Sequence, residues 1–204
     1  MLTGPGANVT VQVGKQGILK RMSAPTGVQP PVNSGKWPTD TFFEDEKSLY
    51  FNDEAVTMLH QPAANTDGDA MVFFRRSDVI GTGDIFSTES CPMIDITRGG
   101  SVQGIIDGLS RIVNLAVPAH EEEGGTLIVP GHGRLCDRSD VVLYRDMLYR
   151  EMVTIVRDRV RHLIDKGLTL DQIGAARPTL DYDPRYGPPD AFIEVVWKSL
   201  RKTS

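Results

Sequence analysis

Two pairs of short strand-like runs, each joined by a tight turn sequence, constrain the fold of this chain most. Asn52-Asp53 separates the runs of the first pair, and Arg76-Ser77-Asp78 separates those of the second. Strand-forming runs joined by two or three turn residues are typical of β-hairpins. The sequence therefore predicts two hairpins of an antiparallel sheet in the middle of the chain. The four predicted strands are residues 48–51, 55–60, 70–75 and 79–82.

Helical periodicity dominates the chain after these strands. Apolar residues recur at helical spacing, with Ser101 as the cap of the first helix, Gly167 just beyond the second, and a capping box from Thr169 to Gln172. A buried strand at residues 126–129, ended by Pro130, interrupts the helices. Strands followed by helices that return onto them predict a layered α/β domain. The predicted helices are residues 101–117, 139–166, the short segment before Pro178, and the segment 193–200.

The first forty residues have a different character. Residues 8–13 alternate between valine and polar side chains, which predicts a half-buried strand. A turn at Gly14-Lys15-Gln16-Gly17 leads to a return strand at 18–19. Residues 20–41, rich in proline and glycine, then predict an irregular loop that is long for a compact domain.

Composition limits the classes of partner and the cellular location. The chain has 204 residues and a net charge of −5, so it lacks the basic excess of most nucleic-acid-binding proteins, and we expect no nucleic-acid partner. No apolar run is long enough for a membrane span, and no signal peptide is visible at the N-terminus. Two cysteines do not indicate an oxidising compartment. We therefore expect a cytoplasmic protein that makes no contact with membranes.

Three glycine-containing segments, each expected just after a strand, hold the candidate functional residues. Asp84 follows Gly83, and His132 lies between Gly131 and Gly133. A carboxylate and an imidazole on converging loops are suitable ligands for a cation such as zinc. Two residues alone favour a simpler interpretation, in which Asp84 caps a turn and His132 bonds to the backbone, because zinc sites normally have three or four protein ligands.

Taken together, the three segments resemble the distal half of the metallo-β-lactamase superfamily. They read Asn65-Thr66-Asp67-Gly68-Asp69, Thr82-Gly83-Asp84-Ile85-Phe86 and Pro130-Gly131-His132-Gly133. The resemblance covers roughly residues 40 to 200. It implies a four-layer αββα sandwich with a site for one or two metal ions, usually zinc, at one edge. It further implies that Asp84 and His132 are metal ligands and that the ancestral chemistry is hydrolysis.

The chain departs from the family pattern in two places. The early H-x-H-x-D-H motif, which supplies several ligands, is absent, because no two of the four histidines are two residues apart. The histidine expected before Thr66 is Asn65, a vestigial ligand position, since an amide is a poor transition-metal ligand. The strand at 18–19 runs directly into sequence that resembles the region after the motif. We therefore expect that a contiguous block is missing near Lys20.

The resemblance divides one domain, residues 1–204, into three parts. Residues 1–19 are N-terminal strands, 20–41 are the junction loop, and 42–204 are the distal half of the fold. The expected architecture is thus an α/β metallo-β-lactamase-like sandwich that is incomplete in its first half.

Several other residues are weaker candidates. Asp67 and Asp69 either orient the metal ligands or form a local turn. His60 is expected to be a packed side chain rather than a ligand, and Cys136 a buried structural thiol. His120 is expected in a solvated loop.

These residues lead to two hypotheses about function. The first is a zinc-hydrolase homologue with an incomplete metal site, weak zinc binding and little or no activity. The second is a non-catalytic protein that binds a ligand or partner in the former active-site groove. The small-molecule substrate or ligand cannot be named from the sequence. Loss of the early block would expose apolar surface, which predicts self-association.

Overall fold

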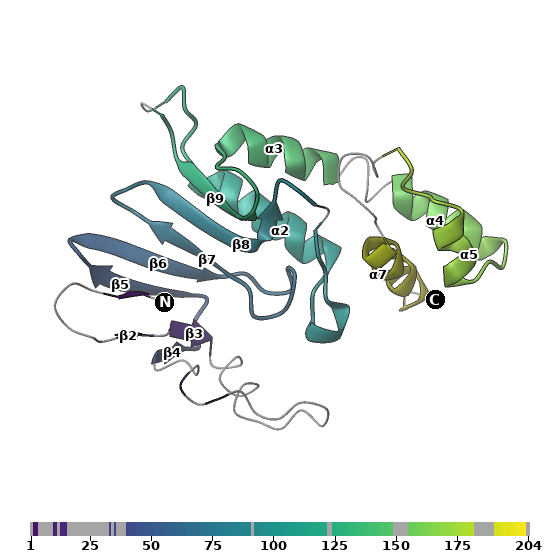
Figure 1. The fold of residues 1–204 in the computed structure, drawn as a ribbon, viewed down its shortest axis with the longest axis horizontal. Coiled ribbons are helices and arrows are strands. Elements are labelled where there is room, and N and C mark those ends of the chain that lie inside the picture. Colours follow the sequence, from purple (N-terminus) through teal and green to yellow (C-terminus); the bar gives the residue numbers. More distant parts are fainter. Residues whose placement is uncertain are drawn as a thin grey trace.

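The predicted hairpins form the first four strands of a five-stranded sheet. The computed structural model describes residues 2–3, 10–11, 13–15, 33, 35, 40–90, 92–121, 124–148, 155–181 and 190–202. Strand order follows the sequence, with antiparallel pairing except between the last two strands, which are parallel (Figure 1). The strands are β5 (Glu46–Phe51), β6 (Glu54–His60), β7 (Ala70–Phe74), β8 (Val79–Ser87) and β9 (Leu127–His132).

Turn residues with positive φ account for the tight hairpins. Asn52 and Asp53 have φ values of 52° and 59°, the pair of left-handed residues that a two-residue type I′ turn requires. Asp78, with a φ of 50°, ends the turn between β7 and β8. Asn and Asp tolerate this conformation better than other non-glycine residues, so the turn sequences fix where each hairpin reverses.

Helices cover one face of the sheet. The helix α2 (Val102–Leu115) begins at Ser101, whose hydroxyl accepts a hydrogen bond from the Gly104 amide as predicted. Its buried side chains, Ile105, Leu109 and Ile112, belong to the same core as the sheet residues. The helix α3 (Arg138–Met147) packs beside α2. This two-layer core, of sheet and helices, supports the edge at which the candidate residues lie.

A second group of helices follows α3 in the chain and lies beyond the end of the sheet (Figure 1). It contains α4 (Arg157–Asp165), α5 (Leu170–Ala175) and α7 (Asp190–Lys202). The predicted capping box at Thr169 opens α5, and Gly167 follows α4 with a φ of 80°. The single helix predicted at 139–166 corresponds to α3 and α4, and residues 149–154 between them lie outside the described part of the chain.

The N-terminal segment forms only short paired strands where it is described. These are β1 (Leu2–Thr3), β2 (Thr10–Val11), β3 (Val13–Lys15) and β4 (Asp40–Phe42). The predicted turn at Gly14-Lys15 is wrong, because both residues lie in β3, which pairs in parallel with β4. The end of the predicted 20–41 loop is also strand, since β4 begins at Asp40. The rest of that loop, apart from residues 33 and 35, and the predicted strand at 18–19 lie outside the described residues.

Within the described part of the chain, no helix combines the length and apolar character needed to cross a bilayer.

A short 3-10 helix, η2 (Ile96–Arg98), precedes α2 and is capped by the Asp95 side chain, which accepts from the Arg98 amide. The architecture is therefore a mixed α/β fold with one substantial sheet and helices on one of its faces.

The close contact between α2 and the loop after β6 yields a stability prediction. A methyl group at Gly104 would overlap the Ala63 carbonyl, so Gly104→Ala should lower the free energy of unfolding by about 1–3 kcal/mol or more. Gly174 in α5 has open space around it, so Gly174→Ala should be neutral or stabilising by up to about 1 kcal/mol. Urea unfolding measures both values. Equal stability of the two variants would contradict the packing described.

Candidate functional site

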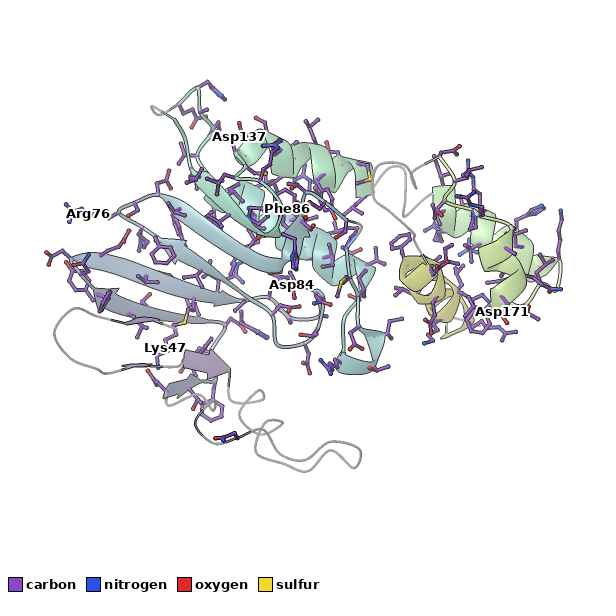
Figure 2. All side chains as sticks on the ribbon, viewed as in Figure 1. Lys47, Arg76, Asp84, Phe86, Asp137 and Asp171 are labelled. Atoms are coloured by element: carbon purple, nitrogen blue, oxygen red, sulfur yellow. The ribbon has the colours of Figure 1, made fainter. Side chains whose placement is uncertain are left out.

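The candidate carboxylate lies within a strand rather than in a loop. The sequence predicts that β8 ends at Thr82, but the strand continues to Ser87, and Asp84 is therefore part of it. The pairing of β8 with β9 shifts register on both sides of Gly83, whose φ is 53°. Glycine adopts this conformation without strain, so the strand passes through an irregularity and continues. Figure 2 shows Asp84 in the second half of β8.

The candidate histidine ends the neighbouring strand. The sequence predicts that Pro130 terminates β9, which is also wrong, because β9 reaches His132 with Pro130 paired to Gly83. A proline is tolerated here because β9 is the last strand of the sheet. A methyl group at Gly131 would lie 2.6 Å from the Gly83 carbonyl oxygen. Only glycine therefore permits the two backbones to approach this closely.

Asp84 and His132 meet at the carboxyl ends of these parallel strands. The His132 Nε2 atom lies 3.6 Å from Asp84 Oδ1, and both side chains are solvent-exposed, His132 by 68% and Asp84 by 52%. Two atoms that each lie about 2 Å from one tetrahedral zinc ion are roughly 3.3 Å apart. The spacing is therefore compatible with a shared cation, although both groups remain largely hydrated.

Asn65 completes this edge of the site from the loop after β6. Its amide nitrogen donates to Asp84 Oδ2 at 3.4 Å, and the residue is 9% exposed. The loop is fixed on the segment before α2, because the Asp95 amide donates to the Asn65 carbonyl at 2.8 Å. A methyl group at Gly100 would overlap the same carbonyl. Position 65 is thus held rigidly next to Asp84.

The other residues of this loop make local contacts. The Asp69 carboxylate accepts from the Thr66 amide at 2.6 Å and from the Thr66 hydroxyl at 3.3 Å. Burial raises the pKa of Asp69, and the charge of Asp84 adds to this rise, while the Thr66 hydrogen bonds lower it. His60 is buried, with Nε2 2.8 Å from the Asp67 carbonyl oxygen. These contacts match a structural turn and a packed histidine.

The remaining candidates lie away from Asp84. His120 is 80% exposed beside Glu121, as expected for a solvated loop. Cys136 is buried, as predicted, and its backbone exchanges two hydrogen bonds with Ile128 of β9.

Sequence reasoning did not single out Thr82, which is fully buried. Its hydroxyl donates to the Val129 carbonyl at 3.3 Å across the β8–β9 pair. A polar residue inside an apolar strand is the signal that could have identified it.

The donor set does not fit the zinc site that the resemblance implies. Among the residues that the structure describes, no three His, Cys, Asp or Glu side chains are grouped so that they could hold a metal ion. Asp84 and His132 provide two donor atoms, and Asn65 directs an N–H group, rather than a lone pair, at Asp84. A stable zinc site normally has three protein ligands and water, or four protein ligands. The described side chains therefore provide too few ligands.

Comparisons with known proteins agree with the fold. No protein-family model matches the chain, and no curated protein matches it. A solved structure of the stereoselective inverting sec-alkylsulfatase from Pseudomonas sp. aligns with a TM-score of 0.53 and 14% identity, covering 79% of this chain and 26% of that one. A double mutant of that enzyme gives a TM-score of 0.54 at 14% identity, with 80% and 26% covered. A B3 metallo-β-lactamase aligns at 17% identity and a TM-score of 0.49, with 70% and 64% covered.

At these identities the likeness shows the fold alone. The layered α/β fold predicted from the sequence is confirmed, and over 79% of its length the chain shares the fold of the alkylsulfatase. The chain spans about a quarter of the length of the alkylsulfatase.

The environment of Cys136 yields a reactivity prediction. Burial raises the pKa of this thiol to about 11, with the negative charge of Asp140 adding to the rise. Little thiolate therefore forms at neutral pH, and the thiolate is the reactive species. In a Cys91→Ser variant, Cys136 should react with a disulfide reagent at pH 7 far more slowly in the folded protein than in urea. Equal rates in the two states would show that the thiol is accessible.

Proposed function

We propose that this chain is a homologue of the metallo-β-lactamase-fold hydrolases whose metal site is incomplete, with little or no zinc-dependent hydrolysis. The observation that carries the proposal is the contact between Asn65 and Asp84. At the position where the family pattern has a histidine, the side chain donates a hydrogen bond to the remaining carboxylate. The amide nitrogen has no available lone pair and the amide oxygen is a poor ligand for zinc, so the described side chains supply two suitable donors, Asp84 and His132.

Zinc would supply a bound hydroxide as nucleophile, since the metal lowers the pKa of its water to about 7. Asp84 and His132 are the residues that would contribute to holding it. Asp84 accepts from Asn65 through Oδ2, while its Oδ1 lies 3.6 Å from His132 Nε2. With both side chains more than half exposed, water competes for the cation, and weak binding is expected.

We further propose that the block carrying the other ligands is missing near Lys20, so that the chain is an internally deleted form of a longer hydrolase. Two features support this. The described N-terminal strands are short, two or three residues each, and they form two separate two-stranded sheets. In contrast, the five-stranded sheet and its loops contain all three segments that resemble the distal half of the family pattern.

A second candidate function is binding of a small molecule without catalysis. A cavity of about 360 Å³ borders Asn65 and is also lined by Ile94, Asp95, Val195 and Lys198, among others. Its volume lies at the lower end of the range for small-molecule sites. Neither Asp84 nor His132 lines it, so a ligand held there would lie beside the two metal-type residues rather than on them.

Metal content and turnover test the main proposal. After dialysis against micromolar zinc, the purified protein should retain well below one zinc ion per chain, because the described residues supply only two ligands. Turnover of nitrocefin, a thioester and bis-p-nitrophenyl phosphate should equal that of Asp84→Ala in the presence of zinc. Metal-dependent turnover that Asp84→Ala abolishes would overturn the proposal.

A gain of function gives a sharper test. Asn65→His would place a third ligand beside Asp84 and should raise zinc affinity by at least about tenfold, measured by titration calorimetry. Asn65→Gln is the matched control, since it changes the size of the side chain without adding an imidazole. Circular dichroism confirms that both variants fold. The same zinc affinity in both would mean that position 65 does not face the cation site.

A further inference from the structure

The cavity beside Asn65 has walls from three separate parts of the chain. Asn65 belongs to the loop after β6, residues 93–97 lead into η2, and Glu194, Val195 and Lys198 come from α7. Its volume is about 360 Å³, which suits a small molecule rather than a polymer. We call it the Asn65 cavity.

Hydrogen bonds and core packing hold these walls in place. The Asp95 amide donates to the Asn65 carbonyl at 2.8 Å, which ties the segment before α2 to the loop after β6. Ile94 and Val195 are buried and belong to the hydrophobic core. A ligand would therefore enter a preformed cavity and would not have to order its walls on binding.

Aliphatic side chains form much of the lining. Ile94, Ile96 and Val195 contribute branched side chains to it. Met93 also lines the cavity and is 64% exposed. Methionine is flexible and adapts to ligands of different shape. Burial of an aliphatic ligand body against these residues is favourable.

The charged side chains around the cavity are already paired. Lys198 forms an ion pair with Glu194, one turn earlier in α7. The Asp95 Oδ1 atom accepts from the Thr97 hydroxyl at 2.5 Å and from the Arg98 amide at 3.1 Å. The Thr97 hydrogen bond is the main cause that lowers the pKa of Asp95, so this carboxylate is ionised at neutral pH. An ionic ligand would lose hydration without gaining an unpaired partner, which favours an uncharged one.

Asn65 offers a polar atom that no described residue uses. Its amide nitrogen donates to Asp84 Oδ2, whereas its amide oxygen accepts no hydrogen bond from any residue that the structure describes. The bond to Asp84 fixes which way the amide faces, because the opposite orientation would place two acceptor oxygens against each other. The amide oxygen is therefore an acceptor for an O–H or N–H group of a ligand.

Building on the second candidate function, ligand binding without catalysis, we propose that the Asn65 cavity binds a small uncharged molecule with an aliphatic body and one hydrogen-bond donor. An alcohol and an amide have this chemistry. The aliphatic body packs against Ile94 and Val195, and the donor bonds to the Asn65 amide oxygen. The ligand needs no metal ion, so the zinc content of the protein does not bear on it.

Titration of the full chain with four probes, followed by ¹⁵N chemical shifts, tests the proposal. Hexan-1-ol is the expected type of ligand, and its isomer 1-methoxypentane lacks the donor. Hexanoate and hexylammonium carry a negative and a positive charge on a similar body. Hexan-1-ol should shift the amide signals of Asn65, Ile94 and Val195. Its affinity should exceed that of the ether by roughly two- to tenfold, the value of one neutral hydrogen bond, and should exceed that of both ions.

Two substitutions locate the site and the acceptor. Val195→Phe fills part of the cavity and should weaken hexan-1-ol binding by at least about fivefold. Met93→Trp, at an exposed position of the lining, replaces it if Val195→Phe fails to fold. Asn65→Leu should remove the preference for the alcohol over the ether. The matched control is Leu143→Phe on α3, where the side chain is 68% exposed and does not line the cavity.

Each outcome decides the proposal. Alcohol binding that the cavity-filling variant weakens and Leu143→Phe does not, with a preference over the ether in the wild type, supports it. Equal affinity for alcohol and ether, or binding insensitive to cavity filling, overturns it. If an ion binds this cavity most tightly, the ligand class is wrong but ligand binding remains. If none of the four probes shifts these signals, both the ligand class and the second candidate function are wrong.

Discussion

The close approach of β8 and β9 at Gly83 and Gly131 is the constraint on which the site depends. A side chain at Gly131 would collide with the Gly83 backbone, and the irregularity at Gly83 lets β8 continue past it. The two parallel strands thereby carry Asp84 and His132 to the same edge, with their side-chain atoms 3.6 Å apart. Close backbone packing, rather than any contact between the two functional groups, creates the pair.

Close backbone packing at glycine residues also fixes Asn65, the third residue of the site. The loop after β6 lies against the start of α2 where Gly100 and Gly104 leave no side chain in the way. The Ser101 amide and hydroxyl then donate to the Ala63 carbonyl. Asn65 is held beside Asp84 by the backbone, so its identity can change without moving the loop. A site assembled in this way keeps its geometry after losing its ligands, which is how we interpret this chain.

Much of the fold could be predicted from local sequence signals. The left-handed turn at Asn52-Asp53, the cap at Ser101 and the capping box at Thr169 act through neighbouring residues, and each lies where it was expected. The proximity of Asp84 and His132 was predicted from a pattern of three motifs. The errors occurred where tertiary pairing overrides local rules. Pro130 continues β9 because it lies on the last strand, and Gly14 lies in β3 because β4 pairs with it.

The exposure of Leu127 and Val129 could not be predicted from the sequence, because it depends on which elements cover which part of the sheet. A strand such as β9 reads as buried, yet only one of its faces contributes to the core. Leu127 and Val129 of β9 are 41% and 37% exposed, while Ile128 between them is fully buried.

A crystal structure grown in the presence of zinc, with anomalous data at the zinc absorption edge, tests the central claim most directly. The account predicts no ordered zinc between Asp84 and His132, with the Asn65 amide nitrogen directed at Asp84. A strong anomalous peak bound by both residues and by further protein ligands would contradict it, and would show that the chain has rebuilt a metal site from residues outside the family pattern.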